Sequence, residues 1–165
     1  MDENVWTGDS DCGVRDRDTS LLTTQMKRTK HDAVFSDCVR IRTLECERCH
    51  FGYPDFPDIR DKSFQNSHYV SRGVASLRFF PGNCFALCGS CHFEVGRDPG
   101  EHYKFVFGQL GEVLFDELMQ KKQTFCRRRK ADMEELYQHY KAEFKRLVAL
   151  RDGGANGRIE FIGYD

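Results

Sequence analysis

The sequence predicts a small α+β domain in which two strands and a helix surround a structural zinc site, with further helices packed around that core. Two Cys-x-x-Cys pairs, Cys46–Cys49 and Cys88–Cys91, are separated by 38 residues, and four thiolates in two such pairs can complete a tetrahedral zinc site. Segments with strand and turn character lie between the pairs, and segments with helical periodicity lie before and after them. A chain of 165 residues is long enough for one domain with a modest core.

The first part of the chain is expected to contain little regular structure before a short helix. Residues 1–30 are rich in polar and charged side chains and show no sustained periodicity, so we expect a flexible N-terminal arm. From Asp32 to Ile41 the apolar residues recur at helical spacing. Residues 51–62, which contain two prolines and several aromatic and charged residues, have the character of a loop.

The segment between the cysteine pairs is expected to hold a strand, a turn and the start of a helix. Residues 65–72 are typical of a strand, and this strand carries His68. Pro81-Gly82-Asn83 is a turn signal, after which the chain runs to the second cysteine pair. A helix is expected from Cys91, ending near Gly96 and the Pro99-Gly100 dipeptide.

Two further helical segments follow. Residues 101–118 have helical periodicity, and Gly108 and Gly111 indicate a break between two short helices. Residues 131–150 form the clearest amphipathic helix of the chain. The predicted domain therefore spans 31–150. The C-terminal tail, 151–165, is expected either to add a short strand or to extend freely from the domain.

The number of cysteines raises the question of the redox compartment. Eight cysteines would suit a secreted disulfide framework, but the N-terminus has neither the basic start nor the apolar run of a signal peptide. The sequence also has no run of about 18 apolar residues that could span a membrane. We therefore expect a protein that is not secreted, with its cysteines kept reduced. The cysteines outside the two pairs are expected to be free or partly buried thiols: Cys12, Cys38, Cys84 and Cys126.

Each cysteine pair is followed by a histidine, which matches the attachment signature of c-type haem. The two matches are Cys46-x-x-Cys49-His50 and Cys88-x-x-Cys91-His92. A di-haem electron carrier would require export, for which the N-terminus gives no support. Zinc is therefore the expected occupant of the four thiolates.

The central segment has residues suited to a phosphodiesterase that uses one metal ion. His68 is the candidate general base, because imidazole titrates near neutral pH. His92, directly after a zinc ligand, is the candidate ligand of a catalytic cation. Asn83 is expected to bridge the loop through side-chain hydrogen bonds to the backbone and so to orient the strand of His68. Arg72 and Arg78 are candidate contacts to phosphate oxygens.

Charge is unevenly distributed along the chain. The formal net charge is −1, so the whole chain has no basic bias toward nucleic acid. Between residues 121 and 151, however, ten Lys and Arg residues outnumber four Asp and Glu residues. The run Arg127-Arg128-Arg129-Lys130 is the candidate DNA-binding part of this region; the alternative is that it only forms a solvated surface.

The motifs of the central segment, taken together, resemble a known family. They are His68-Tyr-x-Ser-Arg72, an Arg78-Phe stretch leading to the turn at Asn83, and Cys88-x-x-Cys91-His92. This segment resembles the HNH (ββα-metal) nucleases and, more narrowly, the bacteriophage NinG (Rap) recombination proteins. The resemblance extends over residues 32–148, with a specific central motif and more general similarity on either side.

The resemblance implies a metal-dependent DNA endonuclease that acts on branched recombination intermediates, such as Holliday junctions and D-loops, in phage recombination. It implies that His68 is the general base, that Asn83 is the middle asparagine of the motif, and that His92 binds Mg²⁺ or a similar ion. The structural zinc ligands would be Cys46, Cys49, Cys88 and Cys91. The expected partner is branched DNA, in the cytoplasm of a bacterial host cell, and paired cuts in a junction would suit a homodimer.

One residue departs from the family pattern. Many HNH nucleases have Asp or His directly before the base as a second metal ligand, and this chain has Ser67 there. The cation would then be held by His92, waters and substrate phosphates. The competing hypothesis is a zinc-containing DNA-binding accessory protein without catalytic activity, which would need neither His68 nor His92.

Overall fold

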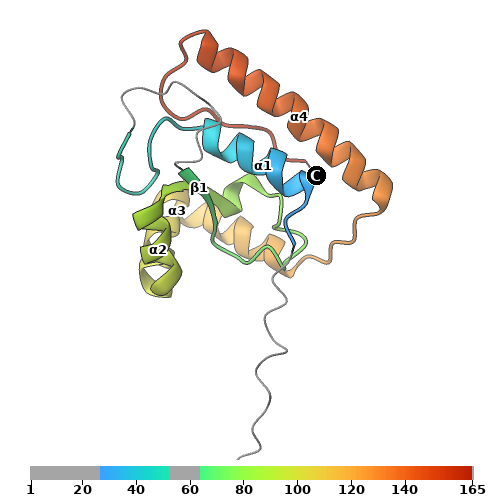
Figure 1. Cartoon of the computed structure of the whole chain (residues 1–165). Coiled ribbons are helices and arrows are strands. Elements are labelled where there is room, and N and C mark those ends of the chain that lie inside the picture. The colour runs from blue at the N-terminus through green and yellow to red at the C-terminus, as the bar shows by residue number, and fades with distance from the viewer. Residues whose placement is uncertain (1–26, 53–63, 165) are drawn as a thin grey trace, which may run out of the picture.

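The computed structural model describes residues 27–52 and 64–164, and these form a mixed α+β fold (Figure 1). The described residues contain four α-helices and one two-stranded antiparallel sheet, which confirms the predicted α+β class. Most of the predicted arm and of the predicted loop at 51–62 lies outside the described residues. The elements are α1 (Lys30–Ile41), β1 (Phe64–His68), β2 (Cys84–Cys88), α2 (Gly89–Arg97), α3 (Pro99–Gln123) and α4 (Lys130–Asp152).

Helix α1 begins slightly earlier than the sequence predicted, because a capping box fixes its first turn. The backbone N–H of Thr29 donates to the carboxylate of Asp32 at 2.7 Å, and the Thr29 side chain accepts a hydrogen bond from the Asp32 backbone. These bonds satisfy donors that the first turn of a helix leaves free. The helix then buries Phe35, Cys38 and Val39 in the core.

The two strands form a hairpin in which Ser67 lies opposite Phe85 and His68 lies opposite Cys84. Strand β1 ends at His68, so the prediction of a strand up to Arg72 was wrong over its second half. The backbone N–H of Tyr69 instead donates to the carbonyl of Asn83, at 3.0 Å, and the chain then folds into a series of turns. The predicted turn at Pro81–Asn83 is a short 3-10 helix that leads into β2.

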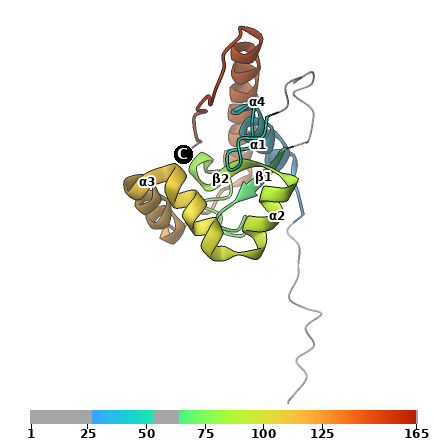
Figure 2. The ribbon, with the colours of Figure 1, turned by 90° about the vertical axis from the view of Figure 1, so that its left-hand side faces the viewer.

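Strand β2 passes directly into α2, which begins at Gly89 rather than at the predicted Cys91. Helix α3 follows after Asp98, whose side chain accepts hydrogen bonds from the backbone of Gly100 and Glu101 at 2.8 and 3.1 Å. The predicted break in the next helical segment is present at Gly111 alone, where φ is +71° and two helical pieces meet at a kink. Helix α2 contacts both strands of the hairpin and packs against α3, and Figure 2 shows α3 to the left and α2 to the right of the strands.

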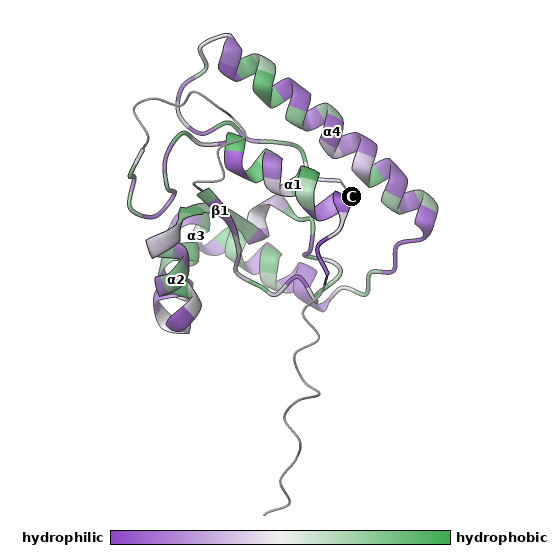
Figure 3. Ribbon diagram, in the orientation of Figure 1, coloured by the Kyte–Doolittle hydropathy of each residue, from purple (hydrophilic) through white to green (hydrophobic). Residues whose placement is uncertain are grey.

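Helix α4 packs along α1, on the side away from α2 and α3 (Figures 1 and 2). The predicted helix 131–150 is thus confirmed. Tyr140 is buried, contacts the ring of Phe35 edge-on at 5.0 Å, and donates its hydroxyl to the carbonyl of Phe79 at 2.6 Å. Figure 3 shows hydrophilic and hydrophobic residues alternating along this helix, as expected for a helix with one buried face.

The C-terminal tail packs back onto the core without forming a strand. The backbone N–H of Ile159 donates to the carbonyl of Arg42 at 2.7 Å, and the buried ring of Phe161 lies 5.8 Å from that of Phe35. Of the two alternatives left open by the sequence, a short strand or a free tail, neither is found. Within the described ranges, no helix combines the length and the apolar character needed to cross a membrane.

Candidate metal centre and histidine cavities

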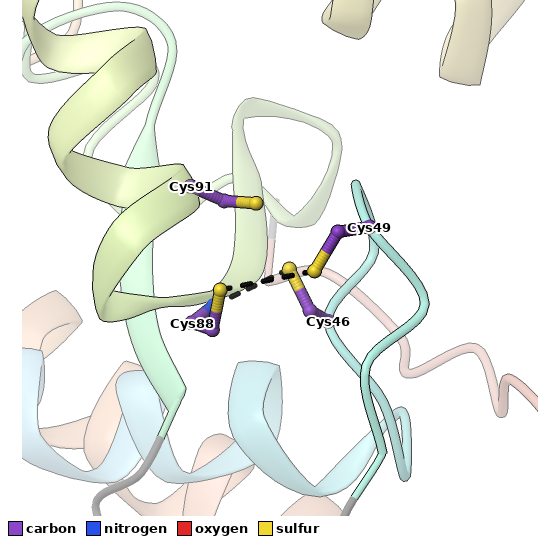
Figure 4. Close-up of side chains that lie close together, drawn as sticks. All are labelled: Cys46, Cys49, Cys88 and Cys91. Carbon is purple, nitrogen blue, oxygen red and sulfur yellow. Dashed lines mark hydrogen bonds between the residues drawn. The ribbon is translucent and has the colours of Figure 1, made fainter.

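The two cysteine pairs meet in space, as the sequence predicted (Figure 4). Cys46 and Cys49 come from the turn after α1, and Cys88 and Cys91 come from the junction of β2 and α2. The four Sγ atoms lie within 4.8 Å of one another, and those of Cys49 and Cys88 are 3.8 Å apart. Zn–S distances of about 2.3 Å place the corners of a tetrahedron about 3.8 Å apart. The four thiols therefore fit a zinc ion.

The surroundings of Cys46 favour the thiolate that zinc requires. Burial opposes ionisation of this thiol, but backbone N–H groups of Cys49, Cys88 and Arg48 donate hydrogen bonds to it and lower its pKa to about 7. The bond from the Cys88 backbone measures 3.3 Å. A thiolate held by backbone donors is a better metal ligand than an ordinary protonated cysteine.

A buried ion pair anchors the first cysteine pair to the rest of the fold. Glu47, between the two cysteines, forms a 2.9 Å ion pair with Arg42, which is fully buried. Glu47 also accepts hydrogen bonds from the backbone N–H of Ala86 in β2 and from Arg158 in the C-terminal tail. No local pattern in the sequence marks these residues, because Ala86 and Arg158 lie far from Glu47 along the chain.

Next to the hairpin lies a cleft of about 710 Å³, here called the arginine cleft. It brings together His68, His92 and Arg72, which the sequence singled out, with Arg28 and Arg40, which it did not. Among the described residues that line this cleft, none is acidic. Arg40 is partly neutralised by an ion pair with Asp37. The cleft therefore presents positive charge beside two imidazoles, an arrangement suited to a phosphate group.

His68, at the end of β1, is held in its neutral form. Burial lowers its pKa to about 4, although the backbone carbonyl of Arg78 accepts a hydrogen bond from the ring and acts in the opposite direction. The positive charge of Arg72 lowers the pKa further. A neutral imidazole at pH 7 has the lone pair that a general base needs, although a pKa of about 4 makes it a weaker proton acceptor than an ordinary imidazole.

Asn83 fixes the loop that follows His68. Its side chain is fully buried; Oδ1 accepts a hydrogen bond from the backbone N–H of Val70 at 2.7 Å, and Nδ2 donates to the carbonyls of Val70 and Leu77 at 2.9 and 3.1 Å. Asn83 therefore makes the side-chain bonds to the loop that the sequence analysis expected. Because it is buried, it acts on the site by positioning the backbone around His68.

His92, in the first turns of α2, is oriented by the hairpin. Its Nδ1 donates a hydrogen bond to Oε1 of Gln65 in β1. This bond places the proton on Nδ1 and leaves the lone pair of Nε2 free to bind a cation. Burial lowers the pKa of His92, which favours the same neutral form.

A second cavity of about 590 Å³, here called the histidine cavity, shares His68 and His92 with the arginine cleft. It also contains His102 from the first turn of α3, which was not among the residues predicted from the sequence. Burial and the nearby His92 both lower the pKa of His102. His102 comes after the motif and carries no spacing signal of its own, since its place depends on how α3 folds back on α2.

The remaining candidate DNA contacts lie apart from these cavities. Arg78 forms two hydrogen bonds of 2.9 and 2.7 Å with the buried carboxylate of Asp32, so its guanidinium already has a partner. In the run Arg127–Lys130, Arg128 donates to the carbonyl of Ala75 at 2.7 Å, whereas its neighbours in the run have exposed side chains. None of these arginines lines the arginine cleft or the histidine cavity.

Comparisons of the chain with models of protein families, with curated proteins and with solved structures find no match.

Proposed function

We propose that this chain is a metal-dependent DNA endonuclease of the HNH type. The observation that carries the proposal is the placement of a neutral histidine, His68, beside His92 in a cleft lined by arginines and, among the described residues, by no acid. The order β1, β2, α2, with the base at the end of the first strand and the candidate metal ligand in the helix, is the order expected of a ββα-metal core.

The chemistry assigned to these residues is hydrolysis of a phosphodiester. His68 takes a proton from the attacking water, and Asn83 holds the backbone loop that sets the position of the imidazole. Arg72, with Arg28 and Arg40, binds phosphate oxygens of the DNA backbone. A divalent cation such as Mg²⁺ at His92 supplies charge stabilisation at the scissile phosphate when it is bound.

Branched recombination intermediates are the proposed substrate class, cut by a homodimer in the cytoplasm of a bacterial host. This part rests on the resemblance of residues 66–92 to the phage NinG proteins. The run Arg127–Lys130 is proposed to add sequence-independent affinity. Replacing its four residues with Gln should make the dependence of log affinity on log salt shallower, by about 0.9 for each duplex phosphate that the run neutralises in the parent protein.

The test is cleavage of labelled branched and linear DNA by zinc-loaded protein, with added divalent cation and after removal of weakly bound cation. His68→Ala should lower the cleavage rate by about 10²–10⁴-fold while DNA affinity stays close to that of the parent. His31→Ala is the matched control, because His31 lies on α1 and lines neither cavity. DNA binding without cation-dependent cleavage would favour the zinc-containing accessory protein instead.

A further inference from the structure

The proposed cation site lacks a ligand at the position before the base. Ser67 occupies that position and is buried, with only 1 % of its surface exposed. A neutral hydroxyl is a weak ligand compared with the carboxylates and imidazoles that proteins use for divalent ions. A cation at His92 therefore needs another protein ligand from elsewhere in the fold.

His102 is the residue that reaches the same cavity from a different helix. The cap formed by Asp98 fixes the first turn of α3, and His102 lies in that turn. Its ring packs edge-on against Tyr69, with 5.1 Å between ring centroids. The residue that follows His68 in the chain thus sets the orientation of His102.

The Nε2 atom of His102 has no hydrogen-bond partner among the described residues, although it is shielded from solvent. Buried polar nitrogens normally have a hydrogen-bond partner, so this unpartnered atom requires an explanation. A metal ion bound to Nε2 would provide that explanation. His92 presents its own Nε2 because Nδ1 is bonded to Gln65. Both rings line the histidine cavity.

We propose that His92 and His102 together bind one divalent ion of the first transition series, with His68 beside it as the free base. This inference rests on the proposed function, because it assigns the protein ligands of the cation that the proposed function requires. In the described part of the chain, the four cysteines are the one group of three or more metal-binding side chains whose ligand atoms lie close together. The remaining coordination positions therefore go to water and phosphate oxygens, as an open catalytic site requires.

The donor set also determines which ion is preferred. Mg²⁺ prefers oxygen ligands in octahedral geometry, whereas imidazole nitrogens suit ions such as Ni²⁺, Co²⁺ and Zn²⁺. Two imidazoles without a carboxylate should therefore bind Ni²⁺ far more tightly than Mg²⁺. The ion that supports cleavage is accordingly expected to be a transition metal ion.

The first experiment is calorimetric titration of the zinc-loaded protein with Ni²⁺ and with Mg²⁺. The parent protein should bind one Ni²⁺ in addition to its zinc, and His102→Gln should bind Ni²⁺ about 100-fold more weakly, at least the loss expected for disturbing a metal-bound histidine. His31→Gln is the matched control and should retain the affinity of the parent. Equal Ni²⁺ affinity in His102→Gln and the parent would overturn the inference.

A second measurement does not depend on a substitution being tolerated. With ¹⁵N-labelled histidine, a second equivalent of Zn²⁺ should give metal-bound ring nitrogens for His92 and His102, among the six histidines of the chain. A metal-bound signal from His68, or from His92 alone, would contradict the proposed pair.

The inference and the proposed function can fail separately. Ion binding that depends on His102, without any DNA cleavage, would support the two-histidine metal site and contradict the proposed endonuclease activity. Cation-dependent cleavage that persists in His102→Gln, with unchanged Ni²⁺ affinity, would support the endonuclease activity and contradict the assignment of His102 as a metal ligand.

Discussion

Replacing Asn83 with Ala should destabilise the fold strongly, although the substitution removes only a small polar side chain. Asn83 is fully buried and makes three side-chain hydrogen bonds, to the backbone N–H and carbonyl of Val70 and to the carbonyl of Leu77. At about 1 kcal/mol for each bond, the free energy of unfolding should fall by about 3 kcal/mol. The effect should be larger if the loop groups remain buried without partners, since each such group costs about 1–3 kcal/mol.

The measurement is urea unfolding at a fixed, saturating zinc concentration, so that metal binding contributes equally to each protein. Asn66→Ala is the matched control. Asn66 lies on β1, but its side chain donates to the hydroxyl of Ser36 at 3.2 Å and to the thiol of Cys84, makes no bond to the loop, and leaves its Oδ1 buried without a partner in the described structure. The control should lose at most about 1 kcal/mol. Equal losses in the two variants would refute the argument that Asn83 holds the loop.

Three other predictions follow from the sites described above. Cys88→Ser should lose zinc and unfold, because metal-binding energy at such a site is also folding energy, whereas Cys126→Ser should keep both its zinc content and its melting temperature. Because burial lowers the pKa of His68 to about 4, the base stays unprotonated as the pH falls past the ordinary value of 6.5. The cleavage rate should therefore decline only near pH 4, and an inflection near 6.5 in the pH–rate profile would contradict the assignment. Arg78→Ala should cost about 3 kcal/mol in urea unfolding, since it leaves the buried carboxylate of Asp32 without its ion-pair partner. Arg72→Ala should leave stability nearly unchanged and make the salt dependence of DNA binding shallower by about 0.9. If Arg72→Ala lowered stability and Arg78→Ala changed only the salt dependence, Arg72 would be the structural residue and Arg78 the phosphate contact.

The parts of the fold that the sequence predicted correctly depend on short-range patterns. The cluster of four cysteines follows from two Cys-x-x-Cys pairs, and α4 follows from a long amphipathic period. Strand β1 was predicted too long because Asn83 takes over the hydrogen bonds of the chain beyond His68. The sequence marks Asn83 as a turn residue but does not show that its side chain replaces a strand partner.

The parts of the site that the sequence could not predict depend on contacts between distant segments. Arg78 was expected to bind phosphate, but the partner that holds it in this structure is Asp32 on α1. Its contact with DNA stays a prediction. His102 went unnoticed because its place in the histidine cavity depends on the cap at Asp98 and on the packing of Tyr69. Neither interaction is visible as a spacing in the chain.

The bond between Arg158 and Glu47 has a consequence for synthesis of the protein on the ribosome. Glu47 lies between two cysteines of the cluster that fits a zinc ion, and part of its charge is balanced by a residue that is made 111 positions later. Both cysteine pairs are complete once residue 91 has been made, so a nascent chain can take up zinc long before Arg158 emerges. Until then, Glu47 can form its ion pair with Arg42 but not the one with Arg158 of the C-terminal tail. The metal can thus organise the centre of the chain early, while final closure of the fold waits for its last segment.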